Sequence, residues 1–155
     1  MPSQNRPRSH TQAAFTLIEL LMTMALLALV TSIAYPSYAS QVNKSRTAQA
    51  IAEIVQLEMD LERYITQNGA LPGTLEAASM QRLDPWGNAY GYLPMEGAQV
   101  GQVRKDKSLH PLNTDYDLYS KGPDGKSVSP LTAKSSRDDI VRANNGAFVG
   151  VAADY

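Results

Sequence analysis

The chain has 155 residues, with 14 basic and 15 acidic side chains and no cysteine. This length allows one soluble domain beside a membrane segment and leaves no room for a second catalytic domain. The near balance of charge argues against a nucleic-acid filament, which would need a basic face. Because disulfides cannot form, an exported domain of this chain must be held by packing or by a metal.

Residues 1–14 form a short leader that carries Arg6 and Arg8. The apolar stretch from Phe15 to Tyr35 follows, and Glu19 is its only formal charge. At about 1.5 Å per residue, a helix of this length matches the apolar thickness of a bilayer. We therefore predict a transmembrane helix over residues 15–35.

Glu19 needs a partner in this position. Burying a carboxylate in a membrane costs about 2.5 to 3.5 kcal/mol on insertion scales, and the apolar stretch contains no Lys or Arg. A cut between Ala14 and Phe15 would create an ammonium group one helical turn from Glu19. The sequence thus predicts that the leader is removed and that the new terminus pairs with Glu19.

The run Phe15-Thr16-Leu17-Ile18-Glu19 behind a basic leader resembles the type IV pilin and pseudopilin family. Members of that family are cut before a Phe that becomes N-methylated, and Glu is their fifth mature residue. The resemblance implies that a prepilin peptidase cuts after Ala14, and that Phe15 and Glu19 serve in assembly. The family usually has Gly before the cut, so we expect Ala14 to slow processing without preventing it.

Two other interpretations of the N-terminal segment stay open. A basic leader before an apolar run also describes an ordinary secretory signal, with Ser37-Tyr38-Ala39 as a possible cleavage site. Against this, the apolar run is longer than the usual 7 to 15 residues and carries Glu19 near its start. The second alternative is a plain single-span anchor of an unrelated protein.

An amphipathic continuation of the helix is predicted over residues 36–68, with a kink at Pro36. Gly69 and Pro72 mark its end. Apolar residues recur at spacings of three and four along it, which predicts one buried face. These residues are Ala50, Ile54, Leu57, Leu61 and Ile65.

Residues 69–155 are predicted to form a globular domain of short helices and strands. We predict a short helix over 75–81 and a turn over 84–92 that enters a strand. Further strands are expected over 100–104, 115–120 and 147–151. The predicted fold class is therefore α+β and pilin-like, with a long N-terminal helix packed on a small antiparallel sheet.

Two segments resemble the major pseudopilins of type II secretion systems. One is Asp84-Pro85-Trp86-Gly87-Asn88 with Tyr90 and Tyr92 behind it, and the other is the run from Tyr116 to Gly125. The resemblance extends from Phe15 to about Ile140. We expect the three aromatic residues to form core and turn packing, since no basic residues are interleaved with them as in a nucleic-acid stacking platform.

The resemblance also implies a calcium site. In that family the loop after the Tyr-Asp-Leu-Tyr-Ser strand binds calcium, which takes six to eight oxygen ligands. Carried over, the ligands would be the carboxylates of Asp124, Asp138 and Asp139 and the carbonyl of Lys121. The interval from Asp124 to Asp138 is longer than this family leads us to expect, and Pro123-Asp124-Gly125 also suits a plain β-turn.

Enzymatic functions find little support in the sequence. His110 would be the only histidine after leader removal, and the Pro111 beside it indicates a loop. The sequence contains no Cys nucleophile, nucleophile elbow, His-Glu-x-x-His helix or phosphate-binding glycine loop. Asp138-Asp139 has no sequence context for acid-base catalysis.

The resemblance therefore implies a structural subunit of a helical filament, anchored in the inner membrane with its C-terminal domain in the periplasm. The implied partners are further copies of the chain, minor pseudopilins, an inner-membrane assembly platform and the prepilin peptidase, with no nucleic acid. The C-terminal extension 141–155 keeps a type IV pilus pilin or minor pilin open as an alternative. A secreted soluble binding protein is a second alternative, and a membrane-anchored enzyme is the weakest.

Overall fold

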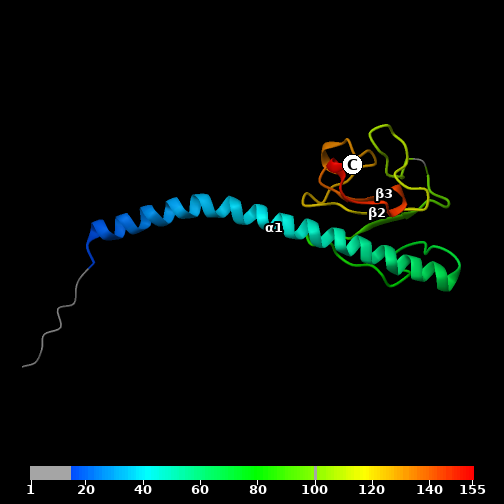
Figure 1. Ribbon diagram of the computed structural model, residues 1–155, viewed down its shortest axis with the longest axis horizontal. Helices are drawn as coiled ribbons and strands as arrows, with labels where there is room; N and C mark the ends of the chain where they lie inside the picture. Colours follow the sequence, from blue (N-terminus) through cyan, green and yellow to red (C-terminus); the bar gives the residue numbers. More distant parts are fainter. Residues whose placement is uncertain (1–14, 100) are drawn as a thin grey trace, which may run out of the picture. The chain divides into compact units, whose positions relative to one another are not determined.

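The computed structural model describes residues 15–99 and 101–155 (Figure 1). Ala14 and the rest of the predicted leader lie outside the described residues. The described chain divides into two compact units, with the boundary between Gln41 and Val42.

The helix α1, Leu17–Asn68, contributes to both units. It continues through Pro36 and ends where the sequence predicts. Gly69 follows the last turn with φ +77°, and its amide donates to the carbonyl of Ile65 at 2.7 Å. This left-handed position suits glycine because it has no Cβ.

A four-stranded sheet belongs to the second unit, Val42–Tyr155. Its strands are β1 (Gly91–Pro94), β2 (Tyr116–Ser120), β3 (Ile140–Ala143) and β4 (Phe148–Val151). They lie in chain order, and each pairs antiparallel with the next. Short 3₁₀ turns span Lys134–Ser136, Asn144–Gly146 and Ala152–Asp154.

The second half of α1 packs against one face of this sheet. Four residues of the predicted stripe, Ala50, Ile54, Leu57 and Leu61, are fully buried there, and Ile65 is half-buried. They join a core made with Leu75, Tyr90, Tyr116, Leu118 and Ile140. A second, smaller core covers the other face with Leu112, Leu131, Val141, Ala143 and Ala152. The α+β prediction is confirmed.

Two predicted elements are wrong. In place of a strand over 100–104, residues 101–103 form a turn, and the Arg104 amide donates to the Asp117 carboxylate at 2.6 Å instead of to a neighbouring strand. In place of a helix over 75–81 there is a single turn, closed by the Met80 amide on the Leu75 carbonyl. Ser79 has φ +57° there, which ends any helical path.

The strand β3 was not predicted. Together with β4, which was, it places much of residues 141–155 in the sheet. All four residues of β3 are buried, because cores lie on both faces of the sheet. A strand covered on both sides lacks the alternation of apolar and polar residues that reveals a half-exposed strand.

Candidate functional site

Thr16 caps the start of α1. Its Oγ1 accepts the backbone N–H of Glu19 at 3.2 Å, and its carbonyl accepts the N–H of Leu20 at 3.2 Å. The segment Thr16-Leu17-Ile18-Glu19 has the spacing of a capping box, in which a hydroxyl and a carboxylate occupy the first turn of a helix. The Glu19 carboxylate therefore lies where the helix dipole favours negative charge.

The apolar side chains of the first unit are exposed in the part of the chain that the structure describes. Among the described residues, α1 is the one helix long and apolar enough to cross a membrane, and no residue of its most apolar segment is buried. Fourteen large hydrophobic side chains here are more than half exposed: Phe15, Leu17, Ile18, Leu20, Leu21, Met22, Met24, Leu26, Leu27, Leu29, Val30, Ile33, Tyr35 and Tyr38. A surface of this kind needs lipid or another protein against it.

Glu19 lies within this apolar surface. Among residues 15–99 and 101–155, no basic side chain forms an ion pair with its carboxylate. The predicted pairing of Glu19 with the Phe15 amine, and the predicted cut after Ala14, stay predictions.

The loop after β2 brings together part of the predicted calcium site. The Asp124 amide donates to Asp138 Oδ2 at 3.3 Å, so these two residues are neighbours. Gly122 makes this approach possible with φ +62°, because a Cβ at that position would collide with the Asp138 carbonyl. Asp124 Oδ1 itself accepts the Lys126 amide at 2.7 Å, as a turn residue does.

The Asp139 carboxylate contacts Arg104 and Ser127. This buried carboxylate accepts from Arg104 Nη2 at 2.5 Å and from Ser127 Oγ at 2.6 Å. In the described part of the chain, no three acidic or histidine side chains gather in a way that could hold a metal. The structure thus places Asp124 beside Asp138 but turns Asp139 toward an arginine, and calcium binding stays a prediction.

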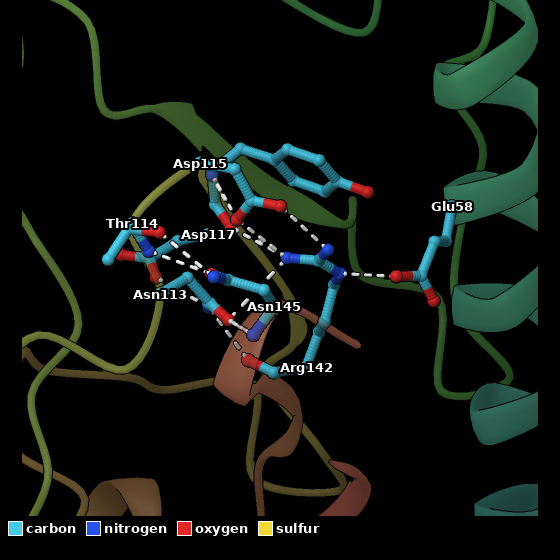
Figure 2. A network of polar contacts seen from close by, with 8 residues as sticks. Glu58, Asn113, Thr114, Asp115, Asp117, Arg142 and Asn145 are labelled. Atoms are coloured by element: carbon cyan, nitrogen blue, oxygen red, sulfur yellow. Dashed lines mark hydrogen bonds and ion pairs between the residues drawn. The ribbon is translucent and has the colours of Figure 1, made fainter. Parts of the chain in front are cut away.

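A second buried arginine, Arg142 of β3, joins the sheet to α1 (Figure 2). Its Nε donates to Glu58 Oε1 of α1 at 2.8 Å, and its Nη1 and Nη2 donate to the two Asp115 oxygens at 2.8 Å each. The guanidinium also lies 4.1 Å from the centre of the Tyr116 ring. A fork bound to a carboxylate in this bidentate way is a strong and directional contact.

Asn113 and Asn145 continue the Arg142 network (Figure 2). Asn113 Nδ2 donates to the Arg142 carbonyl at 3.0 Å and to Asp117 Oδ1 at 3.1 Å. Asn113 Oδ1 accepts the Asn145 amide at 3.0 Å, and Asn145 Oδ1 accepts the Thr114 amide at 2.9 Å. The turns before β2 and after β3 are therefore fixed to each other.

Burial and charge act in opposite directions on the carboxylates of this network. Burial would raise the pKa of Asp115, but the hydrogen bonds from Arg142 and the Tyr116 amide, with the Arg142 charge, outweigh it and lower the pKa. For Asp117, burial outweighs the hydrogen bonds from Arg104 and Asn113, and its pKa is raised. Asp115 is thus the carboxylate that Arg142 stabilises in its charged form.

The aromatic residues Trp86, Tyr90 and Tyr92 pack in or against the core beside α1, which confirms their predicted packing role. The Tyr90 hydroxyl donates to Glu53 Oε2 at 2.7 Å, and the Tyr92 hydroxyl donates to the Pro72 carbonyl at 2.9 Å. Burial raises the pKa of Tyr92 to about 12. These rings hold the segment after α1 against the helix.

His110 lies on an exposed loop, as predicted. Its Nδ1 is 3.8 Å from Asp106 Oδ2, and 78% of its side chain is exposed. This position gives the imidazole no enclosed surroundings in which to act on a substrate.

Sequence reasoning missed Thr16, Arg104 and Arg142. Thr16 had a local signal in the capping-box spacing with Glu19. Arg142 stands alone among the apolar residues of β3, and an arginine in such a run indicates a buried ion pair. Arg104 had no comparable signal, because its partners come from distant loops.

Comparison with known proteins agrees with these features. Residues 9–35 match the family model of the prokaryotic N-terminal methylation motif. That range contains Ala14, Phe15 and Glu19. In this motif and in its fold, the chain is similar to the type IV pilin and pseudopilin family.

Relatives of this pseudopilin-like chain carry the name type II secretion system core protein G. The relative from Klebsiella pneumoniae is 26% identical, and the match covers 83% of this chain and 92% of the relative. Those from Escherichia coli K12 and Vibrio cholerae are each 29% identical over 74% of this chain, covering 84% and 75% of the relatives. No solved structure matches the chain.

Proposed function

We propose that this protein is the major pseudopilin of a type II secretion system, a structural subunit of a helical filament that drives protein export. The observation that carries the proposal is the uncovered apolar surface of the first unit, headed by the capped turn with Glu19. The similarity to type II secretion system core protein G supports the choice of secretion system.

In this proposal the apolar surface is covered first by lipid and then by other subunits. Before assembly, lipid covers it, since all backbone groups of a helix are satisfied within the helix and the side chains are apolar. After assembly, the same side chains pack against those of neighbouring subunits and form the filament core. This proposal places the helix in the inner membrane and the second unit in the periplasm.

Glu19 supplies the axial register in this proposal. The Phe15 amine freed by processing pairs with Glu19 of another subunit, as a buried polar residue fixes the register of a coiled coil. A contact between different surfaces of identical subunits does not close on itself, so its repetition builds a helix. The work is mechanical and requires no catalytic group. Prepilin peptidase, minor pseudopilins and an inner-membrane platform are the proposed partners.

The first prediction concerns processing. We expect the mature chain to begin with N-methyl-Phe15, because the cut after Ala14 creates the partner that Glu19 needs. The measurement is the intact mass of the protein purified from membranes. A mature chain that begins at Ser40 would contradict the proposal and indicate an ordinary secretory signal.

The second prediction concerns the process that the filament serves. Deleting the gene in its own bacterium should leave exported proteins inside the cell while surface pili form normally, and a wild-type copy should restore export. The measurement is the ratio of exported protein in medium and in cells, with electron microscopy of pili. Loss of surface pili with normal export would instead identify a type IV pilus pilin.

A further inference from the structure

Arg104 is buried on the face of the sheet opposite α1. It is 3% exposed, and its guanidinium lies 4.3 Å from the centre of the Tyr119 ring. Val141, which pairs with Tyr119, belongs to the core on this face. Because side chains alternate along a strand, Asp117 and Tyr119 share one face of β2. Both are neighbours of Arg104, Asp117 buried and Tyr119 half-buried.

The Arg104 side chain forms hydrogen bonds with the long loop between Asp124 and Asp138 and with Asp139. Its Nη1 donates to the Ser127 hydroxyl and to the Val128 carbonyl, and its Nη2 donates to Asp139. The Ser127 hydroxyl in turn donates to Asp139. One guanidinium therefore holds the loop and the residue that leads into β3.

The backbone beside Arg104 also forms hydrogen bonds with this loop. The Lys105 amide donates to the Ser129 carbonyl, and the Leu131 amide donates to the Lys105 carbonyl, each at 3.0 Å. The Ser129 hydroxyl donates to the Val103 carbonyl at 2.5 Å. Ser129 and Leu131, which lie in the long loop between Asp124 and Asp138, thus pair with the segment that carries Arg104.

The expected calcium ligands do not fit a calcium ion in this arrangement. Calcium needs six to eight oxygen atoms around it. The Asp139 carboxylate that would supply the charge already has a cation 2.5 Å away, and Asp124 and Asp138 are occupied with backbone amides of their own loop. Asp139 Oδ1 is the one buried carboxylate oxygen of the described residues without a hydrogen-bond partner, too few to build a site.

We propose that the Arg104 guanidinium takes the place of a bound calcium ion, so that the loop from Gly122 to Asp139 is held by an internal cation and does not depend on the metal. This goes beyond the proposed function, because it concerns how the second unit stays folded whatever filament it joins. A subunit of this kind keeps its fold where calcium is scarce.

The decisive experiment uses the full processed chain in detergent micelles. Thermal unfolding is followed by the fluorescence of Trp86, the single tryptophan, with excess calcium, excess magnesium or excess chelator. We expect one melting temperature in all three solutions. A lower melting temperature in chelator that calcium, but not magnesium, restores would overturn the proposal.

Variants test the role of Arg104 itself. Arg104→Gln leaves Asp139 buried without its cation and should lower the melting temperature by about 10 °C or more. The exposed Arg137 is the matched control, and Arg137→Gln should melt with the wild type. Asp124→Ala should also change the melting temperature little, equally with calcium and with chelator.

A double variant separates charge pairing from a general packing effect. Arg104→Gln combined with Asp139→Asn removes both charges, so it should melt above Arg104→Gln alone. Additive loss in the double variant, or wild-type melting of Arg104→Gln, would overturn the proposal. If Arg104→Gln does not fold, the chelator comparison on the wild type still decides.

Discussion

Replacing Glu19 with alanine is expected to abolish or slow filament assembly while leaving residues 42–155 folded. The carboxylate lies in the first turn of α1 within an apolar surface, and Glu19 belongs to neither core of the second unit. Its removal takes about 2.5 to 3.5 kcal/mol off the cost of membrane insertion, so the variant should reach the membrane at least as well as the wild type. The defect should therefore appear at assembly.

The measurement compares variants in a strain that lacks the native gene. Export and filament formation are scored beside the amount of each variant in the membrane. Glu19→Gln keeps the spacing of the capping box but loses the charge, so it should fail as Glu19→Ala does. Glu62→Ala removes an exposed carboxylate from the same helix outside the apolar surface, and should assemble normally.

Two results would count against this role of Glu19. Normal export by Glu19→Ala would show that the carboxylate is dispensable. Normal export by Glu19→Gln alone would assign the role to hydrogen bonding at the helix start instead of to charge pairing.

The sequence predicted best where the signal is local. The helix end at Asn68 follows from Gly69 and Pro72, and the buried stripe follows from a spacing that repeats every three or four residues. β2 and β4 lie within the predicted strands 115–120 and 147–151. Each of these features depends on neighbours along the chain, and a single sequence contains that information.

The sequence predicted least where residues distant along the chain meet. Arg142 and Glu58 are 84 positions apart, and Arg104 and Asp139 are 35 apart. No periodicity relates such pairs. The predicted calcium ligands illustrate the difficulty, because Asp138 and Asp139 are adjacent in the chain yet contact different groups. Asp138 accepts from the Asp124 amide, and Asp139 accepts from Arg104 and Ser127.

The second large effect is expected from Arg142→Met, which should strongly destabilise the second unit. The substitution leaves the carboxylates of Glu58 and Asp115 without their shared cation, and breaking a buried ion pair costs about 3 to 5 kcal/mol. We expect the lower end, about 3 kcal/mol, because Glu58 and Asp115 stay 16% and 34% exposed. That corresponds to a fall of roughly 10 °C or more in melting temperature.

Arg63 provides the matched control for this substitution. It forms an ion pair with Asp60 on the same helix, at 3.4 Å, but its side chain is 64% exposed. Exposed pairs contribute about 0 to 1 kcal/mol, so Arg63→Met should melt close to the wild type. Equal losses in the two variants would mean that the burial of Arg142 has no special effect.

The pH dependence of the Arg142 variant gives a second readout. The pKa of Asp115 is lowered in the folded protein by Arg142, which also faces Glu58 of α1. A lowered pKa adds stability at pH values above the unfolded pKa, about 3.9, and this stability is lost as the pH falls through the folded value. The difference in unfolding free energy between wild type and Arg142→Met should therefore be constant near neutral pH and shrink below about pH 4.

Urea unfolding followed by Trp86 fluorescence measures this difference in unfolding free energy. The substitution Asp115→Asn should remove most of the pH dependence of the difference. A difference that stays constant down to pH values well below 4 would contradict the pairing of Arg142 with Asp115 as its source.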